Sequence, residues 1–423
     1  GLAQFAFFEQ GSWLGYDPSR HRPHGALIQP NVAATLITTG VLLSCYLLVR
    51  AESTSKHSFL LWGCLIFCPI VLVLLQSRVG FLSGLVGLLI ILPYLFYSHR
   101  KRASLILVLI TCSIAVGTAV LQNSEVPKRD HIDYSDGGER KDIYIVSLKM
   151  IADKPLTGFG YGNFQRAYLD YHNMLKREDP SIANPLLRLG HPHNEILYWG
   201  IEGGVVPIIA FVIIAVAFIK LLMKVPDWRL RLALVSVILP VTLHSQTSLP
   251  FYMSLSHWLI LLLLVWYIKQ NAPQTNYTVS FPANFLMKSL AVINVGIFVP
   301  FFVTTLHTNL IISAFESTGY RYIHWLKKIV NPLPWKERLE LNTHSYMLIQ
   351  GLASNDHNKM QTYIDWAKKR IKHTPRVALY NNIILLLKKM NRQAEAEEIT
   401  KEAQLTYPLH IAWGEDLFIE RGN

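Results

Sequence analysis

The most unusual segment of the chain places two histidines and an amide immediately before a long apolar run, at His191, His193 and Asn194. Histidine titrates near neutral pH, so a histidine here could take a proton from a hydroxyl group and later return it. The structural alternative is that these side chains cap a helix or lie in the lipid headgroup layer. A metal site that recruits His172 or His24 as a third ligand is a further alternative. Neither has a diagnostic spacing from the pair, which makes a metal site the weakest of the three interpretations.

Charged residues elsewhere lie at or inside apolar runs, where each needs a partner. Glu202 falls within the run that follows the histidines, and an acid at that depth is expensive unless it is paired or near water. Arg78 lies at the junction of two apolar runs, so its guanidinium must find an anion or several acceptors, or snorkel to lipid phosphate. Arg140 begins a helical pattern, and Arg22 precedes the first apolar run. Arginine forks suit phosphate and pyrophosphate, so these residues suggest a lipid-linked phosphate donor, although a transporter with an external anion site would look similar.

These residues must be positioned by membrane helices. The chain has 423 residues, of which 51% are hydrophobic and 16% charged, whereas a soluble domain carries about 25% charged residues. The apolar residues form runs of roughly 18–25 residues, long enough to cross a bilayer core of about 30 Å. Eight spans are expected, at 32–49, 58–75, 79–97, 103–121, 196–222, 232–249, 252–268 and 286–306.

The chain crosses the membrane in alternating directions, and the basic residues in the loops indicate which side is cytoplasmic. Four basic loops fall on one side of it, around Arg50 and Lys56, at 98–102, at 220–231, and at 269–288. By the positive-inside rule that side is the cytoplasm, which puts the loop at 122–195 and the C-terminus on the outer side. The formal net charge of +12 then sets topology and meets anionic membrane lipid. Nucleic acid is not an expected partner, because no basic and aromatic stripe lies on a soluble domain.

The expected fold is therefore an all-α polytopic membrane protein with a long outer loop and an outer C-terminal helical domain. The layout has an outer segment at 1–31, four membrane helices in 32–121, the loop at 122–195, four membrane helices in 196–306 and the helical domain at 307–423. In that last domain, two amphipathic helices around 377–390 and 394–407 resemble a tetratricopeptide unit. Such pairs stack and offer a concave protein-binding face, and a small helical cap with no partner is the alternative.

Other features narrow the possible sites. The four cysteines all lie inside apolar runs, so neither a disulfide framework nor a cysteine zinc site is expected. The glycine run Gly158-Phe159-Gly160-Tyr161-Gly162 follows a helical pattern and not a strand, which favours a tight turn over a dinucleotide site. The chain opens at Gly1 in a polar stretch, so an N-terminally incomplete sequence is expected.

The motifs, taken together in their order, resemble the O-antigen ligase/polymerase superfamily. They are Arg22 to Asn31, Gln76-Ser77-Arg78, Lys154 to Phe164, His191-Pro192-His193-Asn194-Glu195 and Glu202-Gly203-Gly204. The histidine motif and the helical C-terminus are most similar to the PglL-type bacterial protein O-oligosaccharyltransferases. Members of this family carry further N-terminal spans before the first motif.

The resemblance implies an activity and roles for the residues. The donor would be an oligosaccharide on undecaprenyl pyrophosphate, and the acceptor a Ser or Thr hydroxyl of an exported protein such as a pilin. His193 matches the essential histidine, Arg78 and Arg140 match arginines that hold the pyrophosphate, and His191, Asn194, Glu202 and Arg22 are expected to support them. The reaction would use no metal and no cofactor, would invert the anomeric carbon, and would occur on the periplasmic side of the bacterial inner membrane.

Rival interpretations stay open at this point. A lipopolysaccharide O-antigen ligase would transfer to a sugar hydroxyl on lipid A–core, and an O-antigen polymerase is a further variant. A transporter for an anionic lipid or solute is possible from another class, but the sequence shows no inverted repeat. A membrane-tethered scaffold built on the C-terminal helices would leave the histidine motif dispensable.

Overall fold

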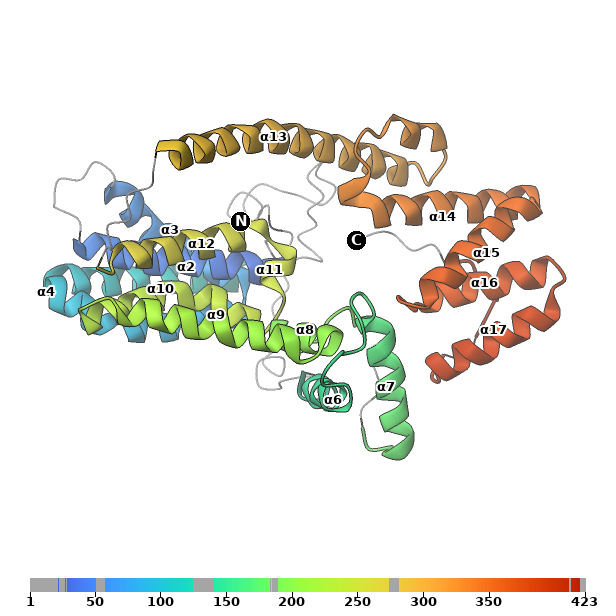
Figure 1. Cartoon of the computed structure of the whole chain (residues 1–423), viewed down its shortest axis with the longest axis horizontal. Helices are drawn as coiled ribbons and strands as arrows, with labels where there is room; N and C mark the ends of the chain where they lie inside the picture. The colour runs from blue at the N-terminus through green and yellow to red at the C-terminus, as the bar shows by residue number, and fades with distance from the viewer. Residues whose placement is uncertain are drawn as a thin grey trace. The chain divides into compact units, whose positions relative to one another are not determined.

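The computed structural model describes residues 22, 27, 29–50, 58–124, 140–182, 184, 189–273, 281–410 and 412–418. Secondary structure in this part of the chain is entirely helical, as expected (Figure 1). Two compact units are present. The membrane unit lies within Gly1–Gly160 and His191–Gln274, and the C-terminal unit within Tyr161–Gly190 and Thr275–Asn423. The predicted residues His24 and Gly25 lie outside the described residues.

Helix α2 forms the centre of the membrane unit, where it packs against three other helices. The helices of this unit are α2 (Pro30–Arg50), α3 (Ser58–Leu75), α4 (Arg78–Gln122), α6 (Arg140–Asp153), α8 (Glu195–Gly203), α9 (Val205–Met223), α10 (Trp228–Ser245), α11 (Pro250–Met253) and α12 (Leu255–Gln270). Leu42 and Tyr46 of α2 are fully buried. Glycines allow α4 to approach α2 closely, since a Cβ at Gly87 would lie 2.5 Å from Leu42 Cδ1.

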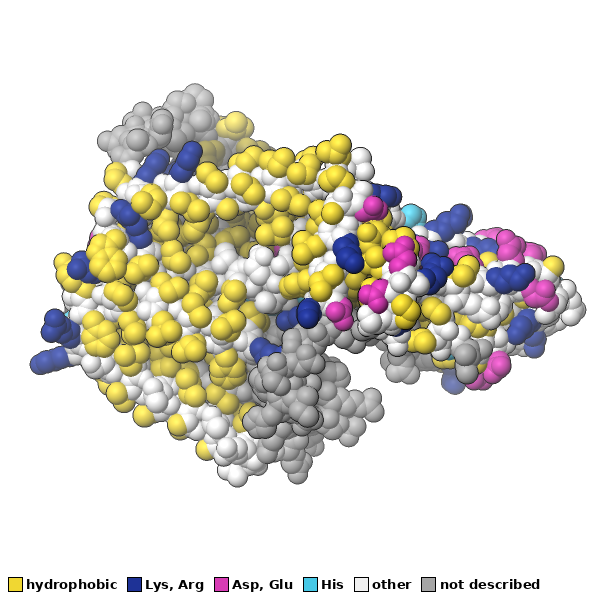
Figure 2. All heavy atoms as spheres, turned by 90° about the horizontal axis from the view of Figure 1, so that it is seen from below, with side chains coloured by type: hydrophobic (Ala, Val, Ile, Leu, Met, Phe, Trp, Pro, Cys, Tyr) yellow, Lys and Arg dark blue, Asp and Glu magenta, His cyan; other side chains and the backbone are white. Residues whose placement is uncertain are grey.

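Helix α9 differs from α2, because none of its residues is buried. Its exposed side chains are Val206, Ile209, Val212, Ile213, Ile214, Val216 and Ile219. Figure 2 shows hydrophobic side chains spread over the helices of the membrane unit, whereas charged side chains gather over the C-terminal helices. A continuous apolar surface of this extent needs lipid to cover it. The chain is therefore a multi-pass membrane protein.

Within the part of the chain that the structure describes, five helices are long and apolar enough to cross a membrane. They are Pro30–Arg50, Ser58–Leu75, Arg78–Gln122, Val205–Met223 and Phe285–Ser317, and α12 is a shorter apolar helix. The predicted spans at 79–97 and 103–121 are two parts of the 45-residue α4, which is interrupted by non-helical dihedrals at His99. The count of eight spans stays a prediction.

Two predicted spans are divided in the structure. The one at 252–268 is interrupted at Ser254, between α11 and α12, and the run at 196–222 is divided into α8 and α9 at Gly204. Gly204 has φ 68°, and a Cβ there would lie 2.6 Å from the backbone of Leu156. The amide of Val205 donates to the carbonyl of Pro155 at 2.7 Å. A tertiary contact with the 155–160 turn therefore interrupts a segment that is continuous in hydrophobicity.

The C-terminal unit contains helices that confirm the expected amphipathic pair. Its elements are α7 (Phe164–Glu178), α13 (Phe281–Ser317), the short 3-10 helices η2 (Ile323–Lys328) and η3 (Leu333–Trp335), α14 (Lys336–Ser354), α15 (His357–Ile371), α16 (Val377–Lys389) and α17 (Gln393–Thr406). The boundary expected at 306/307 falls inside α13. Tyr380, Ile383 and Leu387 of α16 are fully buried in the core of the last four helices. The likeness of these helices to tetratricopeptide repeats stays a prediction.

Candidate active site

The turn between α3 and α4 brings the first two motifs together. Gln76 has a left-handed φ of 47°. The guanidinium of Arg22 donates to the carbonyls of Leu75 at 3.0 Å and of Gln76 at 2.9 Å. Arg22 therefore binds the carboxyl end of α3, where the last carbonyls have no helical partner.

Ser77 and Asn31 complete this turn. The hydroxyl of Ser77 donates to Asn31 Oδ1 at 2.8 Å and accepts from the amide of Gly80 at 3.3 Å. Ser77 is thus the N-cap of α4, and it ties that helix to the start of α2. Arg78 follows as the first residue of α4 and is half-buried. The positive end of the α4 dipole and the Arg78 charge both favour an anion at this position.

The histidine motif forms a compact turn before α8. His193 has φ 56°, a conformation that few non-glycine residues adopt. Its amide donates to His191 Nδ1 at 3.2 Å, and the two rings lie edge to face with centroids 4.4 Å apart. Asn194 is the N-cap of α8, and its Oδ1 accepts from the amide of Leu197 at 3.0 Å. The alternative that Asn194 caps a helix is therefore confirmed.

Two residues that the sequence did not single out hold this turn in place. Tyr144 Oη lies 3.2 Å from the carbonyl of His193 and 2.9 Å from that of Gln246, so one phenol proton is shared between them. Asn194 Nδ2 donates to the backbone carbonyl and to Oε1 of Gln246, each at 3.3 Å. Tyr144 and Gln246 thus fix both the main chain and the amide of the motif to the end of α10. Tyr144 stands four residues after Arg140 on α6, and that helical spacing is the signal that could have identified it.

The third motif, Lys154 to Phe164, packs against the last, Glu202-Gly203-Gly204. The amides of Phe159 and Gly160 donate to the carbonyls of Ile201 at 2.7 Å and Glu202 at 2.9 Å. Gly158 has φ 61°, and a Cβ there would lie 2.5 Å from the Ile201 carbonyl oxygen. The expected tight turn at 158–162 is confirmed, and it binds the end of α8. Glu202 is buried, 3% exposed.

The electrostatics of the motif keep its histidines neutral. Burial, then the neighbouring His191 and the Arg140 charge, together lower the pKa of His193 to about 4. Burial, then the Arg140 charge, also lowers the pKa of His191. Arg140 is exposed at the start of α6, one turn from Tyr144. His193 is therefore a free proton acceptor at neutral pH, beside a permanent positive charge.

A buried chain of hydrogen bonds joins α2 to α10 and α12. Thr35 Oγ1 lies 2.9 Å from His244 Nδ1 and 3.0 Å from His257 Nε2, and His257 Nδ1 lies 3.1 Å from Ser254 Oγ. Thr35, His244 and His257 are fully buried. Because His244 precedes Gln246 by two residues, this chain supports the end of α10 that holds Asn194 and Tyr144.

Replacing Thr35 by valine is expected to destabilise the protein by about 1–3 kcal/mol, because two buried ring nitrogens lose their shared partner. Thr39→Val is the matched control, since the Thr39 hydroxyl donates to the carbonyl of Thr35 at 2.9 Å on the same helix. Thermal unfolding in detergent micelles measures the difference. Equal shifts for both variants would show that the bridge to the histidines contributes nothing.

The structure therefore brings the predicted residues into two groups within one unit. Arg22, Asn31 and Arg78 lie at the α3–α4 turn, and His191 and His193 lie in the turn before α8. Arg140 begins α6, one turn before Tyr144, which donates to the His193 carbonyl. The chain through Thr35 joins α2, which carries Asn31, to His244 near the end of α10, and Tyr144 and Asn194 join the turn before α8 to Gln246 at the same end. His172, the other proposed metal ligand, belongs to the C-terminal unit, where it is buried beside Tyr168. Among the described residues, no three His, Cys, Asp or Glu side chains are grouped to hold a metal ion.

A multi-pass helical membrane protein with arginines and paired histidines gathered at helix ends is the class that this fold and site define. The family model described as "O-Antigen ligase" matches residues 63–212, and the one described as "Virulence factor membrane-bound polymerase, C-terminal" matches residues 232–413. The chain belongs to the O-antigen ligase/polymerase superfamily, whose members are membrane enzymes that transfer glycosyl groups. Searches of curated proteins and of solved structures gave no match.

Proposed function

We propose that this protein is an O-oligosaccharyltransferase that moves a glycan from undecaprenyl pyrophosphate to Ser or Thr hydroxyls of exported proteins such as pilin. The observation that carries the proposal is the turn before α8, where a neutral, half-buried His193 stands beside the Arg140 charge. A neutral imidazole can receive the hydroxyl proton, and a guanidinium can bind the pyrophosphate. Transfer needs both groups, because the imidazole acts on the oxygen that attacks the anomeric carbon and the guanidinium acts on the pyrophosphate that leaves it.

The reaction follows from these two roles. His193 takes the proton of the acceptor hydroxyl as its oxygen attacks the anomeric carbon. The bond from that carbon to the pyrophosphate oxygen breaks, and undecaprenyl pyrophosphate leaves with the electron pair. Arg140 and Arg78 stabilise the negative charge that grows on the leaving group, and direct attack inverts the anomeric carbon. No metal and no cofactor takes part in these steps.

The surrounding residues have supporting roles in this proposal. His191 accepts the His193 amide, Asn194 caps α8, and Arg22 holds the turn that presents Arg78. Glu202 is buried where α8 meets the 155–160 turn. We place the site on the periplasmic face of the inner membrane, with residues 122–195 and 307–423 on that side, because the basic loops favour a cytoplasmic location for the other face.

The second candidate is an O-antigen ligase that transfers to a sugar hydroxyl on lipid A–core. The family match at 63–212 favours it, because the printed description of that family is O-antigen ligase. The outer helices α14–α17 favour the protein acceptor, since paired helices offer a surface that a lipid-borne sugar does not need. A transporter or a scaffold would not require the histidine motif.

A competition between acceptors tests the proposal. The protein in vesicles receives undecaprenyl-pyrophosphate-linked oligosaccharide together with a pilin-type protein and lipid A–core, and mass spectrometry follows both. A mass shift on the pilin alone supports the protein acceptor. A shift on lipid A–core alone assigns the ligase. Loss of donor without a shift on either acceptor contradicts both candidates.

A further inference from the structure

Helix α7 belongs to the C-terminal unit, although its chain is inserted between two parts of the membrane unit. The chain leaves the membrane unit after Gly160, whose amide binds the Glu202 carbonyl at 2.9 Å. It returns at His191, the first residue of the histidine motif. The segment 161–190 is therefore joined covalently to site residues at both ends, while α7 folds with helices more than 200 residues later in the chain.

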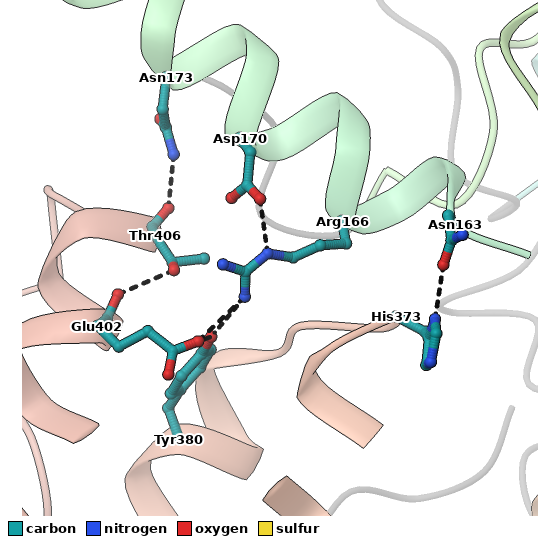
Figure 3. Close-up of polar contacts among 8 residues, drawn as sticks. All are labelled: Asn163, Arg166, Asp170, Asn173, His373, Tyr380, Glu402 and Thr406. Atoms are coloured by element: carbon teal, nitrogen blue, oxygen red, sulfur yellow. Dashed lines mark hydrogen bonds and ion pairs between the residues drawn. The ribbon is translucent and has the colours of Figure 1, made fainter. Parts of the chain in front are cut away.

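Arg166 makes the central polar contact of α7 with those helices (Figure 3). Its Nη1 donates to Tyr380 Oη at 2.9 Å and to Glu402 Oε1 at 3.2 Å, and its Nε donates to Asp170 at 2.7 Å. Tyr380 Oη in turn donates to Glu402 at 2.7 Å. Burial raises the pKa of Tyr380 to about 12, so the phenol keeps the proton that this bond requires. The guanidinium thus joins α7 to α16 and α17 together.

Further contacts extend along α7 on both sides of Arg166. Asn173 Nδ2 donates to the Thr406 carbonyl at 2.8 Å within a buried environment, and Asn163 Oδ1 lies 2.6 Å from His373 Nδ1 (Figure 3). Leu169 is 4% exposed and belongs to the same apolar core as α16 and α17. The helix is therefore held over its length by apolar and polar contacts, which distinguishes it from a loop that rests on a surface by one ion pair.

We propose that the C-terminal unit acts on glycan transfer by holding α7, with Arg166 as a positioning residue for the segment that leads to His191 and His193. This inference rests on the proposed function and adds a role for the C-terminal helices. A unit that only docks the acceptor protein affects the binding of that acceptor. A unit that holds α7 affects the transfer step for every acceptor, including a short peptide that reaches no docking surface.

Charge reversal at the two ends of the contact separates these roles. Arg166→Glu places a third carboxylate beside Asp170 and Glu402, and it is expected to lower kcat about 10- to 100-fold for a pilin-type protein and for a short serine peptide alike. KM for either acceptor is expected to stay within about twofold, an effect of under 0.5 kcal/mol on binding. Combining it with Glu402→Arg restores the opposite charges and is expected to recover most of kcat.

The control is Arg370→Glu, which reverses a half-buried charge of the same unit that pairs with the exposed Glu337 at 3.0 Å. It is expected to leave kcat and KM unchanged. Thermal unfolding of each variant shows whether it folds. A change confined to KM for the protein acceptor, or a double variant no more active than Arg166→Glu, overturns the inference.

Hydrogen exchange keeps the test independent of the enzymatic assay. The Leu197 amide is protected by Asn194 Oδ1 in the turn before α8. Arg166→Glu is expected to increase its exchange rate at least about 10-fold, equal to 1.4 kcal/mol of protection, and the double variant to reverse the increase. If the wild type transfers no glycan but the two variants show these changes in exchange, the proposed function is contradicted and the coupling between α7 and the turn before α8 is supported. Unchanged exchange at Leu197 overturns the coupling.

Discussion

Replacing His193 with alanine is expected to reduce glycan transfer by about 10²- to 10⁴-fold, the range for loss of a general base. The structure gives the physical reason, since His193 is neutral at pH 7 and half-buried beside Arg140. The measurement is the initial rate of acceptor mass shift at saturating donor. His191→Ala is expected to cost less, because His191 supports the amide of His193 at 3.2 Å and does not itself receive the proton.

The left-handed backbone of His193 calls for a second variant. Alanine at φ 56° is strained, so a low rate for His193→Ala could come from a disturbed turn. Asparagine tolerates this conformation and has no basic nitrogen. His193→Asn is therefore expected to keep the unfolding temperature of the wild type and to lose transfer to the same extent as alanine. An active asparagine variant would contradict the assignment of the base.

Replacing Arg140 with methionine is expected to lower kcat about 10²- to 10³-fold, as for the loss of one preorganised group that stabilises transition-state charge. It has a second effect with a definite sign. The Arg140 charge contributes to the low pKa of His193, so its removal raises that pKa from about 4 toward the ordinary 6.5. Since the base works only when unprotonated, activity is retained above this pKa and is lost as pH falls through it. The acidic limb of the rate profile is therefore expected to move to higher pH.

The pH dependence of the wild type checks the same point. The acidic limb of the pH profile of kcat/KM, which reports the free enzyme, is expected near pH 4. The limb of kcat is expected at higher pH, because a bound pyrophosphate brings negative charge that raises the pKa of His193. Lys141→Met is the control, since Lys141 is exposed on the same helix about 100° further round. If the acidic limb of the pH–rate profile does not move in Arg140→Met, the Arg140 charge does not act on the pKa of His193.

The sequence was sufficient to predict the elements that depend on local composition. The spans expected at 32–49 and 58–75 correspond closely to α2 and α3, because apolar runs of membrane length flanked by polar residues leave little choice. The turn at Gln76-Ser77 and the capping by Asn194 also follow from local rules, since serine and asparagine satisfy the free amides of a helix start. The superfamily could be predicted from motif order alone.

Features that arise from contacts across the chain could not be predicted. Gly204 interrupts an apolar run only because the Leu156 backbone lies against it. Tyr144 and Thr35 are uncharged residues within helical patterns, and they acquire their roles from carbonyls and rings on other helices. Helix α7 could be expected as a helix from its amphipathic spacing. Nothing local indicates that Arg166 binds Tyr380 and Glu402, and that contact determines the unit to which α7 belongs.

The break at Gly204 also has a consequence for how the chain enters the bilayer. Helix α9 alone has 19 residues. At 1.5 Å per residue it is about 28 Å long, close to the hydrocarbon thickness. It carries no charged side chain before Lys220. Insertion of α9 therefore does not require α8 to follow it into hydrocarbon. The carboxylate of Glu202, which would add about 2.5–3.5 kcal/mol to the insertion of a helix that contained it centrally, belongs to the separate helix α8. The same nonhelical glycine that shapes the turn therefore separates α9, which is apolar enough to insert, from the helix that carries Glu202.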